Sequence, residues 1–327
     1  MTRSKLLGAK LLMGACALAA TGLAFGAMAQ DKPAEPPPLW AWPGNQPAKP
    51  ADKDKIETIA GSTQKFNEVQ IKDRTTAVDW FPAGHPAMPA AVKGGGKGFA
   101  CGYCHLPEGP GRTESADVAG MPADYLYRQL QDMKSGARSM MDPHYGPQGN
   151  MIITAKAWSD ADLRAAADYF TKLKFTQRVK VIESADAPKT RPNAFVYEFE
   201  KTGEKEPLGD RIIEGPNDFE GFEKRDHRVT FTAYVPIGAI ARGAALAKGD
   251  SMKGLPACES CHGAGLKGGT IAPPIAGRYP TGVFRQLYAF KTGSRNGSAS
   301  GFMKPMVASL SQKDMIDLAA YVGSLKP

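Results

Sequence analysis

Apolar residues recur every three or four positions in several stretches of the chain, which is the spacing of an α-helix with one buried face. The first stretch covers residues 124–135 and ends at Gly136, a common stop signal. Two later stretches begin at Ser159 and Ser311, and each serine stands three residues before an aspartate, as in an N-terminal capping box. Their apolar positions, which we expect to face a core, are Leu163, Ala166, Ala167 and Phe170, then Met315, Leu318, Ala319 and Val322.

The chain contains this pattern twice. Cys258 follows Cys101 by 157 positions, and the tripeptide Arg–Gln–Leu at 128–130 recurs at the same offset. From Met151 onward the offset is 152, so one difference in loop length accounts for the change. Two constant offsets over this many positions indicate two copies of one domain. We therefore predict a mainly α-helical protein built from two related domains.

The first 30 residues have the three parts of a secretory signal. Three basic residues open it, residues 11–27 are apolar and uncharged, and Ala27–Met28–Ala29 fits the small-x-small cleavage pattern. An uncut membrane anchor is the alternative, but the apolar stretch is short for a span. A lipid anchor on Cys16 would lack the usual aliphatic residue upstream. We predict cleavage, a periplasmic location and no stable membrane span in the mature protein.

Two parts of the chain have no counterpart in the repeat. Between the copies, residues 194–199 and 228–235 alternate like strands and indicate a β-hairpin. Near the N-terminus, residues 31–50 are rich in proline and are typical of an extended tether. The predicted organisation is a signal peptide at 1–29, an N-terminal extension at 30–98, a first domain at 99–177, an insertion at 178–236 and a second domain at 237–327.

Charge does not point to a nucleic-acid partner. The formal net charge of +8 falls to +5 once the predicted signal, with three basic and no acidic residues, is removed. The sequence has no basic run and no basic patch interleaved with aromatic residues. We expect no nucleic acid among the partners.

The cysteines carry the sharpest chemical signal. One of the five lies in the predicted signal peptide, and the other four form two Cys-x-x-Cys pairs, each followed directly by histidine: Cys101, Cys104 and His105, then Cys258, Cys261 and His262. Cys-x-x-Cys-His is the attachment signature of haem c. A four-cysteine zinc site and two redox dithiols are the alternatives, but neither needs a histidine directly after each pair.

The spacing of the motif suits this chemistry. Two cysteines three positions apart lie on one side of a helical turn, where both thiols can reach the vinyl groups on one edge of a porphyrin. The next residue projects toward the iron. We therefore predict two covalently bound haem c groups, with His105 and His262 as proximal iron ligands. Arg128 and Arg285 also repeat, and we expect a solvated helix face for them, with pairing to haem propionates as the alternative.

The repeat also predicts the second axial ligand of each iron. Met151 and Met303 stand at equivalent places, each eight residues before a capping serine, and we expect both in loops where the thioether can turn toward iron. Most methionines fill gaps in cores. The nearby alternatives are Met140, Met141, Met306 and His144, of which the histidine has no counterpart in the second copy.

These motifs resemble the tandem dihaem class I cytochromes of the cytochrome c4 group. The matching stretches, about half of the predicted mature chain, are CGYCH, YRQLQDMKSGAR and MIITAKAWSDADLRAAADYF, then PACESCH, PPIAGR, FRQLYAFKTGSR and MKPMVASLSQKDMIDLAAYV. The resemblance implies two class I cytochrome c domains with a small β-containing insertion between them, and Met151 and Met303 as distal ligands. It also implies that the carbonyl of Pro273 accepts a hydrogen bond from the His262 ring, which orients the imidazole.

The chain departs from the family pattern in three places. Ala116 stands where Pro273 aligns, which leaves the equivalent bond to His105 open. The glycine-rich residues 93–98 replace the usual first helix before Cys101. The extension and the insertion are additions, either for docking a dehydrogenase or for covering the haem edges.

The resulting interpretation is an electron carrier and not an enzyme. It would pass single electrons between a periplasmic dehydrogenase or quinol oxidoreductase and a terminal acceptor such as a terminal oxidase. The alternative is a dihaem cytochrome c peroxidase, which needs an open iron and an acid–base side chain beside it. Both copies keep the same methionine pattern, which favours the carrier. A non-redox chain with structural metal is a third hypothesis.

Overall fold

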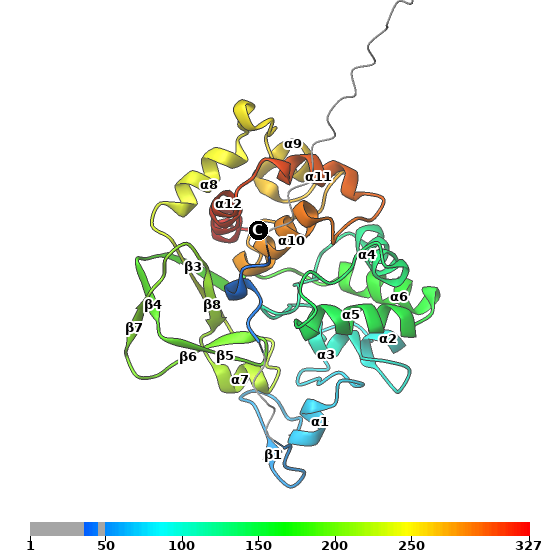
Figure 1. The fold of residues 1–327 in the computed structure, drawn as a ribbon. Helices are drawn as coiled ribbons and strands as arrows, with labels where there is room; N and C mark the ends of the chain where they lie inside the picture. The colour runs from blue at the N-terminus through cyan, green and yellow to red at the C-terminus, as the bar shows by residue number, and fades with distance from the viewer. Residues whose placement is uncertain (1–35, 45–49) are drawn as a thin grey trace, which may run out of the picture. The chain divides into compact units, whose positions relative to one another are not determined.

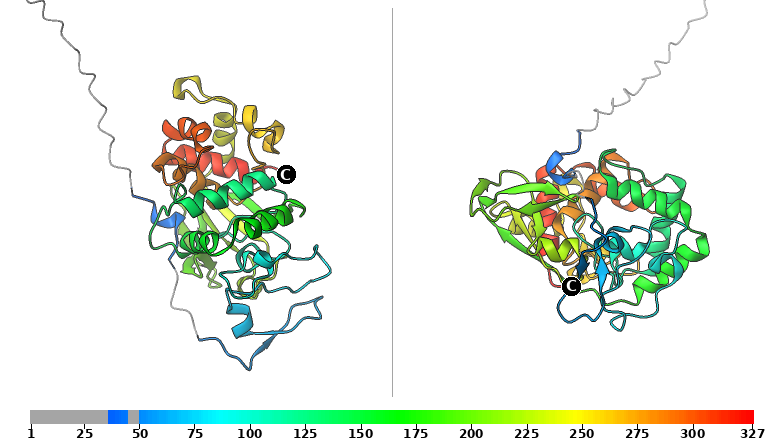
Figure 2. Two further views of the ribbon diagram at one scale, coloured as in Figure 1. Left: turned by 90° about the vertical axis from the view of Figure 1, so that its right-hand side faces the viewer. Right: turned by 90° about the horizontal axis from the view of Figure 1, so that it is seen from below.

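The computed structural model describes residues 36–44 and 50–327 of the 327-residue chain. The predicted signal peptide and Cys16 lie outside the described residues. Within the described part, no helix combines the length and apolar character needed to cross a membrane. Figures 1 and 2 show two groups of helices, one coloured cyan to green and the other yellow to red. The two groups lie against each other, with a set of short strands beside them.

The first copy of the repeat is helical. Its helices are α2 (Ala90–Lys93), α3 (Cys101–His105), α4 (Ala123–Ser135), α5 (Gly146–Ala157) and α6 (Asp160–Thr171). Helix α6 contacts α2 and α4, and its predicted apolar face is buried at all four positions. Trp158, at the C-terminal end of α5, joins the same core.

The second copy repeats this arrangement. Its helices are α8 (Ala239–Ala247), α9 (Glu259–His262), α10 (Pro280–Thr292), α11 (Ser300–Ala308) and α12 (Gln312–Ser324), with 3-10 turns η2 (Ser251–Lys253) and η3 (Ala264–Leu266). Helix α8 packs on α12, where Arg242 donates to both carboxylate oxygens of Asp317 at 2.8 Å. In the first copy the one-turn α2 packs on α6 in the place of α8, and it ends at Gly94, whose φ of 89° suits glycine.

Helix boundaries follow the local sequence. Gly136 ends α4 in the left-handed conformation, with φ 87°. The side chains of Ser159 and Ser311 accept hydrogen bonds from the backbone N–H groups of Asp162 and Asp314. In α12 the Asp314 carboxylate also accepts from the Ser311 N–H at 2.8 Å, which completes the capping box. The predictions for these three helices are confirmed.

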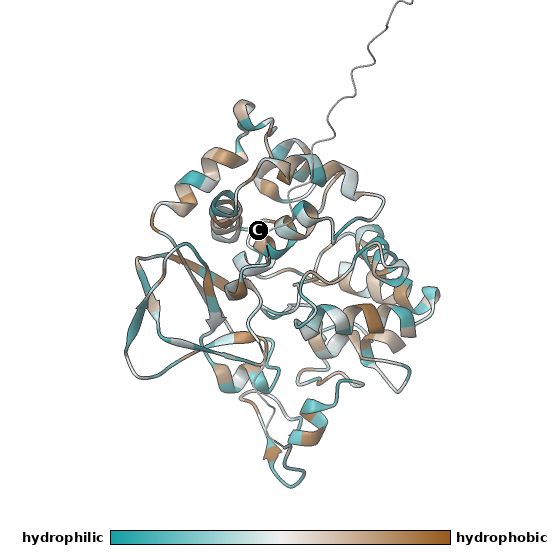
Figure 3. Cartoon of the chain, in the orientation of Figure 1, coloured by the Kyte–Doolittle hydropathy of each residue, from teal (hydrophilic) through white to brown (hydrophobic). Residues whose placement is uncertain are grey.

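The insertion consists of short strands and one short helix. In chain order they are β3 (Val179–Glu183), β4 (Asp186–Pro188), β5 (Thr190–Asn193), β6 (Val196–Phe199), β7 (Lys205–Pro207), β8 (Ile213–Pro216), α7 (Phe219–Glu223) and β9 (Phe231–Val235). Strand β9 lies between β3, which runs parallel to it, and β8, which runs antiparallel. Strands β4 and β7 form an outer ribbon that is hydrophilic along most of its length (Figure 3).

A hairpin is present in the insertion, but not between the two predicted runs. Residues 194–199 contain β6 and residues 228–235 contain β9, yet β6 pairs with β5, while β9 pairs with β3 and β8. Ala194 and Phe195 connect β5 to β6 with φ of 50° and 66°, as in a two-residue hairpin turn. Alternation predicts a strand but carries no information about its partner.

The part of the N-terminal extension that the structure describes folds onto the domains. It contains η1 (Leu39–Ala41), β1 (Ile56–Glu57), β2 (Phe66–Asn67) and α1 (Glu68–Lys72). The rings of Trp40 and Trp42 lie 4.6 Å and 6.3 Å from that of Phe284 on α10. Residues 36–44 are therefore docked and not an extended tether, because two indole rings supply enough apolar area to hold a short segment.

Candidate functional site

The first cysteine pair occupies a single helical turn. Cys101 begins α3 and Cys104 follows one turn later, and both are free thiols in the structure. Burial raises the pKa of Cys101 to about 12, so this group is held as a thiol at neutral pH. Leu106 ends the turn with φ 57°. The α3 turn thus presents both sulfurs and the following histidine from one short, rigid element.

His105 is held in one defined tautomer. It is buried, and its Nδ1 lies 2.6 Å from the carbonyl oxygen of Ala116. Because a carbonyl only accepts, Nδ1 carries the hydrogen and Nε2 keeps its lone pair. Burial lowers the pKa of His105, so the ring is neutral at physiological pH. A neutral imidazole with a free Nε2 is the form that binds a metal.

The second copy builds the same arrangement. Cys258, Cys261 and His262 lie on and just before α9, and the His262 Nδ1 is 2.9 Å from the Pro273 carbonyl oxygen. Burial likewise lowers the pKa of His262. The bond expected for Pro273 is present, and the question left open for Ala116 is answered, since the acceptor is a backbone carbonyl and the side chain there is immaterial.

The residues present fit a covalently attached haem. Each site offers two thiols one helical turn apart and an adjacent imidazole whose Nδ1 is engaged by a backbone carbonyl, which leaves Nε2 available for a metal. In each copy the hydrogen bond from Nδ1 to a backbone carbonyl orients the imidazole, as is usual for metal-binding histidines.

The two predicted methionines are helical, which corrects the expectation of loops. Met151 lies in the second turn of α5 and Met303 in the first turn of α11, and both are half-buried. Pro147 in the first turn of α5 favours helix there because its fixed φ suits that position. Met303 packs against the same core cluster as Met306 and Met141.

Repeat-equivalent residues join the two copies. Arg138 and Arg295 face each other as an isolated antiparallel β-bridge. Two backbone hydrogen bonds of 2.7 Å flank it, from the Ser139 N–H to the Ser294 carbonyl and from the Asn296 N–H to the Ala137 carbonyl. Each bond is the counterpart of the other under the repeat, so this junction has approximate two-fold symmetry.

Side chains extend the symmetry of the junction. Arg138 donates to the Oε1 atoms of Gln129 and Gln286 at 3.1 Å and 2.9 Å. Arg295 donates to the same two oxygens at 2.8 Å and 3.0 Å. Arg138 and Arg295 are equivalent under the 157-residue offset, and each stands two residues after the glycine that ends a helix, Gly136 or Gly293. This shared polar position is the signal in the sequence that could have identified them.

Neither guanidinium forms an ion pair in the described part of the chain. Arg295 is buried and Arg138 is half-buried, and the charge of the nearby Asp132 carboxylate offsets only part of the effect of burial on Arg138. Burial and the charge of Arg295 lower the pKa of Arg138 to about 9. Burial is the main cause of the lowered pKa of both histidines. The charge of Arg138 lowers the pKa of His105 further, and the charge of Arg295 does the same for His262. The junction therefore holds one positive charge near each motif histidine.

Arg128 and Arg285 differ in their environments. Arg128 is exposed on α4, as expected. Arg285 is buried on α10 and donates to the carbonyl oxygens of Ala41 at 2.6 Å and Thr113 at 2.7 Å. The expected solvated face is wrong for Arg285, because the docked residues 36–44 cover it.

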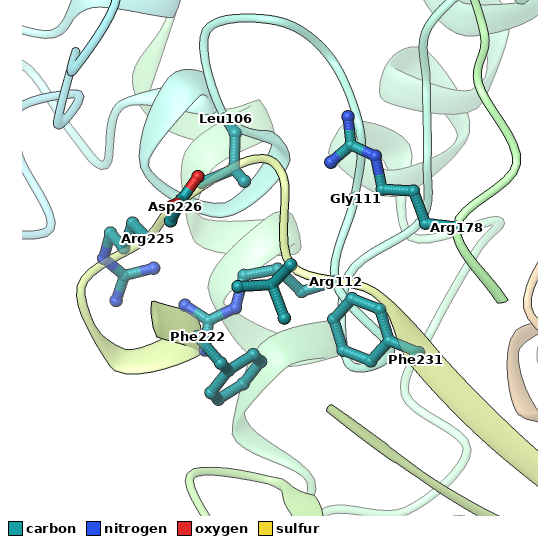
Figure 4. A pocket seen from close by; sticks show the side chains of 9 residues that line it. Leu106, Gly111, Arg112, Arg178, Phe222, Arg225, Asp226 and Phe231 are labelled. Carbon is teal, nitrogen blue, oxygen red and sulfur yellow. The ribbon is translucent and has the colours of Figure 1, made fainter. Parts of the chain in front are cut away.

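An arginine of the insertion holds the first motif from outside. Arg225 donates from Nη1 to the Tyr103 carbonyl at 2.8 Å and from Nε to the Ile71 carbonyl at 3.1 Å. Its guanidinium lies 3.4 Å from the centre of the Tyr103 ring. Figure 4 shows Arg225 beside a small pocket, in which Arg112 lies over the ring of Phe222.

Comparison with known proteins gives several matches. Residues 240–326 match the family model described as Cytochrome c. Cytochrome c4 of Azotobacter vinelandii is 28% identical over 251 residues, which cover 74% of this chain and 91% of that protein. The thiosulfate dehydrogenase electron acceptor of Thiomonas intermedia is 28% identical over 211 residues, 62% of this chain and 68% of that protein. Cytochrome c-554(547) of Halothiobacillus neapolitanus is 36% identical over 77 residues, 21% of this chain and 85% of that protein.

Proposed function

This chain belongs to the cytochrome c family and is an electron carrier of the cytochrome c4 type, and we propose on that basis that it holds two haem c groups and works in the periplasm. One group would be attached at Cys101 and Cys104 and the other at Cys258 and Cys261. The peroxidase alternative receives no support from the relatives compared above, which are named as cytochromes or as an electron acceptor.

The observation that carries this proposal is the matching state of two histidines. His105 and His262 each engage Nδ1 with a backbone carbonyl eleven residues further along and keep Nε2 for the iron. When bound, each haem supplies a one-electron change between ferric and ferrous iron. The carbonyl contacts fix the imidazole planes, and burial keeps water from both rings.

We assign Met151 and Met303 as the distal ligands. Their equivalent positions in the two copies support the assignment: Met151 lies on α5, the helix after α4, and Met303 lies on α11, the helix after α10. A thioether raises the reduction potential relative to a second histidine. It also closes the sixth position, which favours electron transfer over binding of oxygen or peroxide.

Arg138 and Arg295 are the residues that would hold haem propionates. A guanidinium inside the protein that forms no ion pair is costly, and an acid group supplied by a cofactor would offset that cost. The placement of each arginine near the histidine of its own copy supports this assignment.

The partner we propose is a periplasmic dehydrogenase that donates electrons. The relative from Thiomonas intermedia is named as the electron acceptor of a thiosulfate dehydrogenase, which supports a dehydrogenase donor here. A quinol oxidoreductase and a terminal oxidase are the other redox partners of this class. Residues 30–98 and 178–236 are the segments we assign to partner docking.

The test is an absorption spectrum of the ferric protein made with the haem-attachment machinery. We expect the weak long-wavelength band of methionine-bound ferric haem at the intensity of two haems. Met151→Ala and Met303→Ala should each remove half of it, while the control variants Met140→Ala and Met306→Ala should keep it whole. A band that stays unchanged in Met151→Ala or Met303→Ala would contradict the ligand assignment.

Intact-protein mass spectrometry tests the number of haems independently. We expect the mass of the processed chain plus two haems. A chain mass without haem, or with a single haem, would overturn the two-haem proposal. Steady peroxide turnover by the reduced protein would instead revive the peroxidase alternative.

A further inference from the structure

Two segments of the chain bring metal-binding side chains together outside both cysteine motifs. Asp79 and His85 come from the N-terminal extension, and Glu108 comes from the loop after α3. One ligand atom from each lies within 4.8 Å of the others. His227 of the insertion lies beside the cluster, with Nδ1 2.9 Å from Glu108 Oε1, but it is not one of these three residues. The cluster thus joins the extension to the first cytochrome domain.

His85 directs its second ring nitrogen, Nε2, into this cluster. Its Nδ1 lies 2.9 Å from the Pro86 carbonyl oxygen, which fixes the hydrogen on Nδ1. Its Nε2 is buried, lies 3.2 Å from Asp79 Oδ1, and has no hydrogen-bond partner among the described residues. The side chain is only 3% exposed. A neutral His85 with its hydrogen on Nδ1 would present the Nε2 lone pair to the cluster, which is the usual state of a metal-binding histidine.

The contacts inside the cluster are close but do not have hydrogen-bond geometry. Glu108 Oε1, like His85 Nε2, is buried without a hydrogen-bond partner in the described part of the chain, although His227 lies 2.9 Å away. Lone pairs that face each other at such distances repel unless a cation or proton lies between them. Ligand atoms around tetrahedral Zn²⁺, with bonds of about 2.0 Å, are roughly 3.3 Å apart. The His85–Asp79 separation of 3.2 Å matches that spacing.

We propose that Asp79, His85 and Glu108 bind one Zn²⁺ ion, with a water molecule as the fourth ligand. Imidazole nitrogen and carboxylate oxygen are donors that Zn²⁺ takes in proteins. The ion would fasten the extension to the first domain. The competing arrangement is metal-free, with His85 doubly protonated between the two carboxylates.

The experiment uses the protein with its haems attached, treated with a chelator and then dialysed against micromolar Zn²⁺. Elemental analysis should find one zinc per chain in addition to the iron. His85→Gln and Glu108→Gln should each lose the zinc. The matched control His144→Gln should retain it, since His144 also stands beside an aspartate but is 92% exposed in its side chain. Zinc should raise the Tm of the parent protein by about 5 °C and leave that of His85→Gln unchanged.

Two results would overturn the proposal. The first is less than one zinc per chain in the parent protein. The second is a nitrogen-15 NMR spectrum of zinc-treated protein in which both ring nitrogens of His85 carry hydrogen, because that is the ion pair without metal. The haem absorption spectrum reports separately on the electron-carrier function, so failure of one proposal leaves the other testable.

Discussion

At the scale of single residues, the buried carboxyl of Glu214 makes the stability of the fold depend on pH. It lies on β8 and is 3% exposed, and its carboxyl accepts a hydrogen bond from the Thr281 N–H at the start of α10. Its other oxygen has no hydrogen-bond partner among the described residues. Burial raises the pKa of Glu214 to about 7, against the partial relief given by Thr281 and Arg285. Glu214 therefore stays protonated in the folded protein under mildly acidic conditions.

This carboxyl makes stability fall as the pH rises. Its pKa is about 7 in the folded protein and near 4.5 in the unfolded chain, so the folded state holds the extra proton between those values. The free energy of unfolding should drop by about 3 kcal/mol from pH 4.5 to pH 7 and then level off. In Glu214→Gln this decrease of the free energy of unfolding with pH should vanish. Urea unfolding at several pH values measures the free energy, and the same pH dependence in both proteins would refute the prediction.

At the scale of elements, the insertion reinforces the first haem motif through one side chain. Helix α3 is a single turn and has no side-chain cap. Arg225, which follows α7, has φ 62° and reaches the Tyr103 carbonyl within that turn. The insertion is thus part of the structure that holds α3 in place, in addition to the docking role proposed above.

Removing this arginine should loosen α3. Arg225→Ala deletes two hydrogen bonds to buried carbonyls and a cation–π contact, and we expect a loss of about 2–4 kcal/mol in the free energy of unfolding. Hydrogen exchange should accelerate in α3 and α1. Arg191→Ala is the matched control, because Arg191 belongs to the same insertion but is 60% exposed in its pair with Glu198. Unchanged exchange in α3 would show that Arg225 does not hold it.

At the scale of the whole molecule, the Arg138–Arg295 junction couples the two cytochrome domains through charge. Both guanidiniums bond the same pair of glutamines, so neither domain can shift without breaking contacts of the other. Positive charge held near a haem disfavours the more positive ferric state. The junction is therefore expected to raise both reduction potentials.

Replacing either arginine should lower the potential of the haem in its own domain. For Arg138→Gln and Arg295→Gln we expect a decrease on the order of tens of mV. The reason is that a guanidinium charge near the haem interacts with the charge on the iron by about a kcal/mol at an effective dielectric of about 20. Spectroelectrochemical titration of the two haems measures this. Arg164→Gln, which alters an exposed arginine on α6, should leave both potentials unchanged. A rise in potential would contradict the assigned role.

The features that the sequence predicted are those carried by local chemistry. The helices that begin at Ser159 and Ser311, the stop at Gly136 and the carbonyl contact of His262 depend on neighbouring residues and appear as expected. Pairing between distant segments leaves no such mark. Nothing in residues 194–199 and 228–235 specifies which strands they join, and nothing near Arg285 shows that a segment from residue 41 covers it.

The two-fold character of the junction has a consequence for how the halves fit. Arg138 and Arg295 both bond Gln129 and Gln286, which are themselves equivalent, and the flanking backbone bonds exchange places when the two copies are interchanged. An interface of this kind is self-complementary, as in a symmetric homodimer. Each half therefore offers the other the same set of groups that it receives, and one stretch of repeated sequence supplies both sides of the contact.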